Sequence, residues 1–122
     1  MPVKKILLLE DNIDLAIGLE TILKTYGHDV SRTIDGEIAL SVCEEKLPDL
    51  VITDLALHKM DGVEFLSKFR EYPGAKEVPV IAMTGVIDRY SVNDIRNLGV
   101  REILLKPFNL DHFMTAVRAS LP

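Results

Sequence analysis

Two kinds of segment alternate along the chain, and this alternation restricts the possible folds more than any other feature. Five short runs are rich in β-branched and aliphatic residues, and each is followed by a segment whose apolar residues have helical spacing. Strands that alternate with helices form βαβ units, with the strands parallel in one sheet and helices on both faces. The sequence therefore predicts an α/β fold with a doubly wound, five-stranded parallel sheet. The expected strands are Lys5–Leu9, Asp29–Thr33, Leu50–Thr53, Val80–Thr84 and Glu102–Leu105.

The apolar content of these runs indicates where some of the strands lie. Lys5–Leu9, Leu50–Thr53 and Val80–Thr84 are almost continuously apolar, as expected for strands buried on both faces. Asp29–Thr33 is more polar, which favours a position at the edge of the sheet.

Five helices are expected, each bounded by capping or turn residues. The apolar face of the first is expected to include Tyr26, and that of the fifth Leu110. The boundary signals are Gly27 after the first helix, Asp35 and Pro48 around the second, Asp61 and Gly74 around the third, Gly99 after the fourth (Arg89–Leu98), and Asn109 before the fifth.

Length and composition favour one small domain in the cytoplasm. A chain of 122 residues has the length of a single domain. Its one cysteine, Cys43, excludes an internal disulfide and is interpreted as a small core residue. No apolar run approaches the roughly 20 residues of a membrane-spanning helix, and no signal-peptide pattern is present. The net charge of −5 argues against a nucleic-acid surface over the whole domain, so neither nucleic acid nor membrane is expected as a partner.

Polar side chains collect where the expected strands end. Glu10 and Asp11 follow the first strand, Asp54 follows the third, Thr84 ends the fourth and Lys106 follows the fifth. Because open parallel sheets carry their sites at the carboxyl ends of the strands, we expect these residues to share one rim. Three carboxylates and one ammonium give that rim a formal charge of −2.

This set of residues is suited to phosphoryl transfer with a bound metal ion. Clustered carboxylates repel one another unless a cation intervenes, and an oxygen donor set with few protein ligands favours Mg²⁺. The histidines His28, His58 and His112 are scattered, so a zinc site is not expected. A metal ion and a lysine can neutralise phosphoryl oxygens while a carboxylate acts as the nucleophile. Asp54 is the best candidate, because it follows the central strand.

Five short motifs at these strand ends carry a family resemblance. They are Glu10-Asp11, Asp54 after Asp49–Thr53, Met60-Asp61-Gly62, Pro79–Gly85 and Lys106-Pro107-Phe108. Each motif alone is common, but in this order they make the chain, over essentially all of residues 1–122, resemble the CheY-like receiver domain of two-component response regulators. The resemblance implies a flavodoxin-like strand order 2-1-3-4-5. It also implies a phospho-switched signalling module that catalyses only its own phosphotransfer and autodephosphorylation.

The resemblance assigns roles to individual residues. Asp54 would be the phosphoacceptor, phosphorylated from a sensor histidine kinase or a phosphotransfer protein. Glu10, Asp11 and Asp54, together with the backbone carbonyl of Ala56, would hold Mg²⁺.

Further roles concern the response to phosphorylation. Thr84 and Lys106 would each bind a phosphoryl oxygen, and a cis peptide bond before Pro107 would aim the lysine inward. Phosphorylation would then alter the conformation of the surface near the fourth helix, fifth strand and fifth helix. The family usually has an aromatic residue three positions before the lysine, and here that residue is Ile103. An aromatic switch of the usual kind is therefore not expected.

Other departures concern the loops and the ends of the domain. Leu57-His58 stands where the family often has Met-Pro, and small or apolar Ala56 and Val86 predict slow loss of the phosphoryl group. The chain ends at Pro122 after the expected fifth helix, so the output is expected on a downstream effector or on a removed segment. The family's winged-helix class carries acidic and basic pairs on a dimer face formed by the fourth helix, fifth strand and fifth helix. Such pairs are not evident in this sequence, which favours a monomer.

Three other functions require residues that this chain lacks or would have lost. A phosphatase of the haloacid-dehalogenase type would carry a second aspartate two positions after the nucleophile, where this chain has Ala56. A pseudo-receiver would have lost Asp54, Lys106 or the acidic pair. A flavodoxin-like carrier would have a Ser/Thr-rich phosphate loop in place of Asp11-Asn12. The phospho-switched module fits the residues best.

Overall fold

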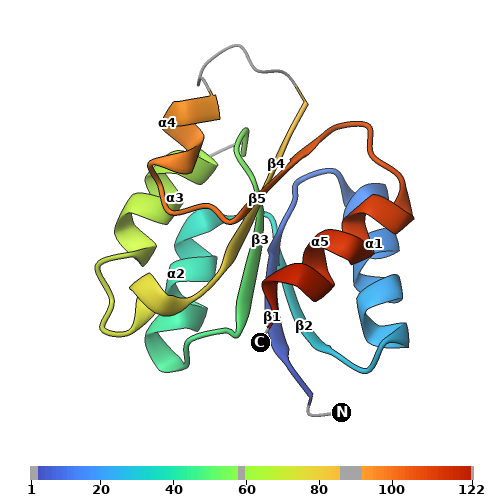
Figure 1. The fold of residues 1–122 in the computed structure, drawn as a ribbon. Coiled ribbons are helices and arrows are strands. Elements are labelled where there is room, and N and C mark those ends of the chain that lie inside the picture. Colours follow the sequence, from blue (N-terminus) through green and yellow to red (C-terminus); the bar gives the residue numbers. More distant parts are fainter. Residues whose placement is uncertain (1–2, 58–59, 86–91, 122) are drawn as a thin grey trace.

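The computed structural model describes residues 3–57, 60–85 and 92–121, and its centre is a parallel sheet of five strands in the order β2-β1-β3-β4-β5 (Figure 1). This confirms the doubly wound, flavodoxin-like order. All five expected strands are present, and β3 continues one residue further than expected. The polar strand β2 lies at an edge, as its composition indicated. The strands are β1 (Lys5–Leu9), β2 (Asp29–Thr33), β3 (Leu50–Asp54), β4 (Val80–Thr84) and β5 (Glu102–Leu105).

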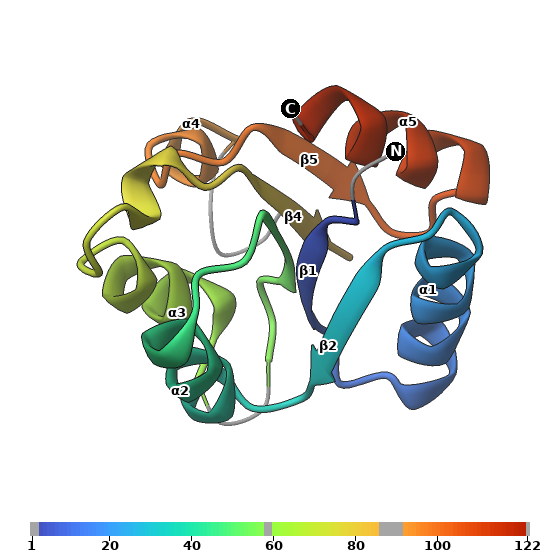
Figure 2. The same ribbon diagram turned by 90° about the horizontal axis from the view of Figure 1, so that it is seen from below.

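Helices cover both faces of the sheet. α1 and α5 lie on one face, and α2, α3 and α4 lie on the other (Figures 1 and 2). In the described part of the chain, no helix is long and apolar enough to cross a membrane. The helices are α1 (Ile13–Thr25), α2 (Gly36–Glu45), α3 (Gly62–Phe69), α4 (Val92–Arg96) and α5 (Leu110–Ser120), with a short 3₁₀ helix η1 (Ala75–Glu77) before β4.

Each face of the sheet has its own hydrophobic core, because successive side chains of a strand point to opposite faces. In β1, Ile6 and Leu8 pack with Phe113 of α5, whereas Leu7 and Leu9 pack in the core under α2 and α3. Every residue of β3 and β4 is buried. The central strands are therefore held from both sides, which fixes the positions of the residues at their carboxyl ends.

Side-chain caps begin four of the helices. Asp35, Asp61 and Asn109 each accept a hydrogen bond from a backbone N–H in the first turn of α2, α3 and α5, so these three expected caps are confirmed. Asn12 caps α1 in the same way, accepting from the N–H of Leu15 at 3.1 Å. These caps satisfy donors that a helix leaves unpaired at its start.

Two residues expected on buried helix faces are exposed, which corrects the sequence prediction. Tyr26 and Leu110 each have 51% of their surface accessible. Tyr26 is the C-cap residue of α1, and its ring lies beside the guanidinium of Arg118, 5.3 Å from the ring centroid. Leu110 is the first residue of α5. Helical spacing identifies a face, but the ends of a helix can extend beyond the core.

The segments around α4 and η1 also differ from the prediction. Residues 89–91 of the expected fourth helix lie outside the described residues, and α4 ends at Arg96, before a turn that leads to Gly99 at φ +77°. The helix η1 follows Gly74, whose φ is +83°, and was not expected. Cys43 is buried as predicted, and burial raises the pKa of its thiol to about 11.

Candidate functional site

The carboxyl ends of the strands bring the predicted side chains to one rim. Glu10 directly follows β1, Asp54 ends β3, Thr84 ends β4 and Lys106 directly follows β5. Glu10, Asp54 and Thr84 are buried, with accessible fractions of 0%, 5% and 7%. Residues far apart in the sequence thus share one site, because parallel strands end at the same edge.

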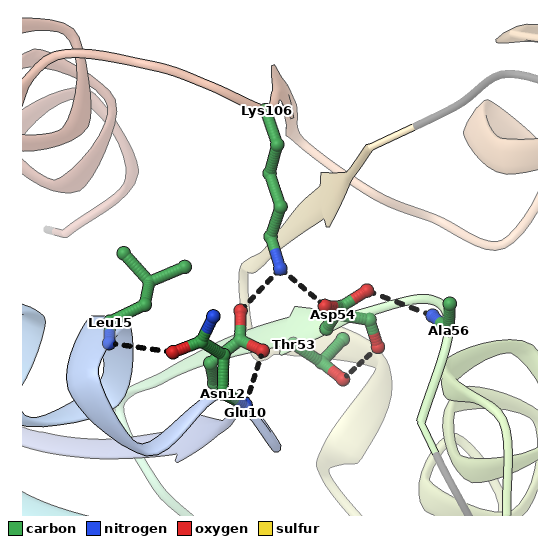
Figure 3. A network of polar contacts seen from close by, with 7 residues as sticks. All are labelled: Glu10, Asn12, Leu15, Thr53, Asp54, Ala56 and Lys106. Atoms are coloured by element: carbon green, nitrogen blue, oxygen red, sulfur yellow. Dashed lines mark hydrogen bonds and ion pairs between the residues drawn. The ribbon is translucent and has the colours of Figure 1, made fainter.

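Lys106 lies between two of these carboxylates (Figure 3). Its Nζ atom donates to Oε1 of Glu10 and to Oδ2 of Asp54, each at 2.5 Å. The N–H of Lys106 donates to the carbonyl of Thr84 at 2.7 Å, which joins the ends of β5 and β4. The peptide bond between Lys106 and Pro107 is cis, as the resemblance implied.

Burial and ion pairing shift the pKa values of Glu10 and Lys106 in different ways. Burial of the Glu10 carboxylate raises its pKa above the ordinary value, although Lys106 and the N–H of Asn12 lower it in part. Burial disfavours the charged form of Lys106, but the hydrogen bonds and charges of Asp54 and Glu10 outweigh that effect and raise its pKa. The lysine is therefore held in its cationic form between the two acids.

Three acidic side chains at the rim could hold a cation. The carboxylates of Glu10, Asp11 and Asp54 each offer an oxygen, and these oxygens lie within 4.8 Å of one another. One ammonium against three carboxylates leaves a formal charge of −2, which a divalent ion would neutralise. Hard oxygen ligands in small number fit Mg²⁺, so the residues present are compatible with that ion.

The backbone around Asp54 is closely held. The N–H of Ala56 donates to Oδ1 of Asp54 at 2.8 Å, and the N–H of Leu55 donates to the carbonyl of Met83 at 3.0 Å. Gly62 begins α3 directly against this turn: a Cβ atom on Gly62 would lie 2.3 Å from the Asp54 carbonyl oxygen. Only glycine fits at such an approach, so the Asp61-Gly62 motif brings the start of α3 against the end of β3.

The structure adds one residue that sequence reasoning did not select. Asn12 both caps α1 and donates its backbone N–H to Oε2 of Glu10 at 3.1 Å. This contact orients the carboxylate that faces Lys106 (Figure 3). The available signal was an asparagine directly before a segment with helical spacing, which is typical of an N-cap.

Two of the residues at which the sequence departs from the family pattern, Ile103 and Leu57, lie in the described part of the chain. Ile103 is partly buried on β5 and packs against the core under α2 and α3. Leu57 is buried. His58 and Val86 lie outside the described residues.

A doubly wound sheet with a carboxylate–lysine site at its carboxyl edge defines the class of fold, and sequence comparison defines the family. Residues 6–118 match the family model of the response regulator receiver domain. The "Probable chemotaxis protein CheY" of Rhizobium etli is 31% identical over 116 residues, covering 94% of this chain and 90% of that protein. The chain therefore belongs to the response regulator receiver domain family.

Two further relatives extend this comparison. The "Probable transcriptional regulator ycf27" of Porphyridium aerugineum is 32% identical over 121 residues, which is 99% of this chain and 49% of that protein. The chain thus spans about half the length of that relative. The solved receiver domain of the sensor histidine kinase PA1611 from Pseudomonas aeruginosa has 25% identity and a TM-score of 0.87, covering 98% of each chain. That structure is described with a magnesium ion coordinated in the active site cleft.

Proposed function

We propose that residues 1–122 act as a phosphoacceptor module in which Asp54 receives a phosphoryl group in the presence of Mg²⁺. The observation that best supports this proposal is the environment of the Asp54 carboxylate. One of its oxygens accepts from the amide of Ala56, the other contacts the ammonium of Lys106, and Glu10 lies on the far side of that ammonium. A buried carboxylate beside a fixed cation and further acids is suited to bind and accept a phosphoryl group.

The chemical step is a displacement at phosphorus. An oxygen of Asp54 forms a bond to the phosphorus of the donor, and the bond from phosphorus to the donor breaks, so the donor leaves with that electron pair. The donor would be a phosphohistidine of a sensor histidine kinase or phosphotransfer protein, or a small acyl phosphate. The ammonium of Lys106 would neutralise a phosphoryl oxygen. Mg²⁺, held by Glu10, Asp11, Asp54 and the carbonyl of Ala56, would neutralise charge on the transferred group.

The new phosphoryl group would change which partners Lys106 and Thr84 contact. Lys106 bridges Glu10 and Asp54, so a dianion on Asp54 would compete with Glu10 for its ammonium. The carbonyl of Thr84 accepts a hydrogen bond from the N–H of Lys106. The hydroxyl of Thr84 would bind a second phosphoryl oxygen. These shifts would repack Ile103 and the surface of α4, β5 and α5. A downstream effector that contacts this surface would then bind either the phosphorylated or the unphosphorylated protein more tightly than the other. The process would take place in the cytoplasm.

Turnover of a phosphorylated substrate is less well supported than this switch. A phosphatase with an aspartyl-phosphate intermediate needs a general acid–base near the nucleophile. Position 56, two residues after Asp54, is an exposed alanine that cannot transfer a proton. Slow loss of the phosphoryl group by hydrolysis would follow.

The direct test uses acetyl phosphate as the donor and intact mass as the readout. With Mg²⁺ present, the protein should gain the mass of one phosphoryl group, and a metal chelator should suppress the gain. Asp54→Asn should abolish it. Asp49→Asn is the matched control, because Asp49 lies just before the same strand and accepts from the N–H of Lys5, away from the rim. An adduct that persists in Asp54→Asn would overturn the proposal.

A further inference from the structure

Thr53, the residue before the proposed acceptor, carries a buried hydroxyl with a specific partner. Its accessible fraction is 0%, and its Oγ1 donates to the backbone carbonyl of Asp54 at 2.8 Å (Figure 3). The pairing of β1 with β3 ends at Leu9 and Thr53, one residue before that carbonyl. The hydroxyl therefore supplies a donor to a buried carbonyl that lies beyond the last register pair of β1 with β3.

Packing does not by itself require a hydroxyl at this position. The three residues of β3 that precede it, Leu50 to Ile52, are aliphatic, and valine has nearly the shape of threonine. A buried hydroxyl costs free energy unless it is hydrogen-bonded, so its presence directly after three aliphatic residues calls for a specific use. The hydrogen bond to Asp54 is that use.

The same peptide group is also held by α3 and β4. The start of α3 packs so closely that a Cβ atom on Gly62 would lie 2.3 Å from the Asp54 carbonyl oxygen and 2.7 Å from Cα of Leu55. The N–H of Gly62 donates to the carbonyl of Leu55 at 3.0 Å, and the N–H of Leu55 donates to Met83 of β4 at 3.0 Å. The peptide between Asp54 and Leu55 thus has little freedom to rotate.

This peptide leads directly to the amide that faces the acceptor. The N–H of Ala56 donates to Oδ1 of Asp54 at 2.8 Å. We propose that Thr53 is a positioning residue: its hydroxyl holds the Asp54–Leu55 peptide so that the Ala56 amide stays directed at the Asp54 carboxylate. Its effect on the rate of phosphorylation rests on the proposed function, whereas its effect on the Ala56 amide does not.

The test compares variants that differ in one hydroxyl. Thr53→Val removes the donor and keeps the shape, and Thr53→Ser keeps the donor. Thr33→Val is the matched control, because the Thr33 hydroxyl also bonds to backbone at a strand end, accepting from the N–H of Asp35 at 3.1 Å, but on the edge strand β2. Should Thr53→Val not fold, Thr53→Ala and Thr53→Ser form a pair that differs only in the hydroxyl.

Two readouts are measured, both corrected for global stability from urea unfolding. The first is the hydrogen-exchange rate of the Ala56 amide, resolved by nuclear magnetic resonance. The second is the initial rate of phosphorylation by acetyl phosphate at saturating Mg²⁺. We expect Thr53→Val to raise the exchange rate of the Ala56 amide and to lower the initial rate of phosphorylation. Each change should be a factor of about three to ten, the effect of one lost hydrogen bond. Thr53→Ser and Thr33→Val should leave both near the wild-type values.

The two readouts separate failure of the inference from failure of the proposed function. If Thr53→Val lowers only the global stability and the Ala56 amide keeps its exchange rate, the hydroxyl has a merely structural role and the inference is wrong. If the wild-type protein forms no adduct, the proposed function fails, and the exchange of the Ala56 amide still decides the role of Thr53.

Discussion

Lys106→Met tests whether the ammonium at the rim stabilises the fold by separating two buried acids. Methionine keeps much of the aliphatic length of lysine and removes the charge. Glu10 is then fully buried without its cation, and Asp54 loses the donor at Oδ2. Removing one partner of a buried ion pair costs about 3–5 kcal/mol. Because the Lys106 side chain keeps 22% of its surface exposed, we expect the lower value of about 3 kcal/mol.

That loss corresponds to a large shift in thermal stability. An unfolding entropy of about 2.1 cal/mol/K per residue, applied to 122 residues, gives about 0.26 kcal/mol/K. Lys106→Met should therefore lower Tm by about 12 °C at pH 7.5. Lys24→Met is the matched control, because Lys24 pairs with Glu20 one helical turn away and has 57% of its side chain exposed. It should change Tm by about 2 °C or less.

The pH dependence gives this prediction a direction as well as a size. The folded-state pKa of Glu10 is already raised by burial, and loss of Lys106 removes the contacts that lower it in part. A carboxyl with a raised pKa contributes stability that is fully present below its unfolded pKa and is lost as pH rises through the folded value. The Tm deficit of Lys106→Met should therefore shrink as pH falls from 7.5 towards 5. Scanning calorimetry measures both effects; a deficit equal to that of Lys24→Met, or one that grows at low pH, would refute the reasoning.

Two further predictions concern packing and burial. Gly62→Ala should destabilise the protein by about 1–3 kcal/mol, because the added methyl would meet the backbone of Asp54 and Leu55. Gly18→Ala, in α1 with open space around it, should stabilise by about 0.5–1 kcal/mol, and a result in which both variants behave alike in urea unfolding would contradict the close approach. Burial raises the pKa of Cys43 to about 11, so a thiol reagent at pH 8 should modify the native protein at least about 100 times more slowly than the unfolded protein. Equal rates would show that the thiol is accessible.

The sheet and the membership of the site could be predicted because both depend on simple periodic rules. Alternating strands and helices determine a parallel sheet, and parallel strands end at one edge. Glu10, Asp54 and Lys106 could therefore be placed together before any geometry was known, and the structure joins them in one network.

The contacts within the site could not be predicted, because they depend on atomic distances between segments. No sequence pattern predicts that the Thr53 hydroxyl donates to the carbonyl of Asp54, or that Gly62 lies against the same carbonyl. The exposure of Tyr26 and Leu110 escaped prediction for a related reason. Helical spacing gives the direction of a side chain, whereas its burial depends on how far the sheet extends beneath that end of the helix.

The most direct test of the central claim is to locate the phosphoryl group on the chain. After incubation with acetyl phosphate and Mg²⁺, the acyl phosphate can be reduced with borohydride, which converts the modified aspartate to homoserine and allows its position to be read by tandem mass spectrometry. We predict conversion at Asp54 alone, lost when Mg²⁺ is chelated. Conversion at Asp11 or at another acid, or no conversion in the folded wild-type protein, would contradict the assignment of Asp54 as the phosphoacceptor.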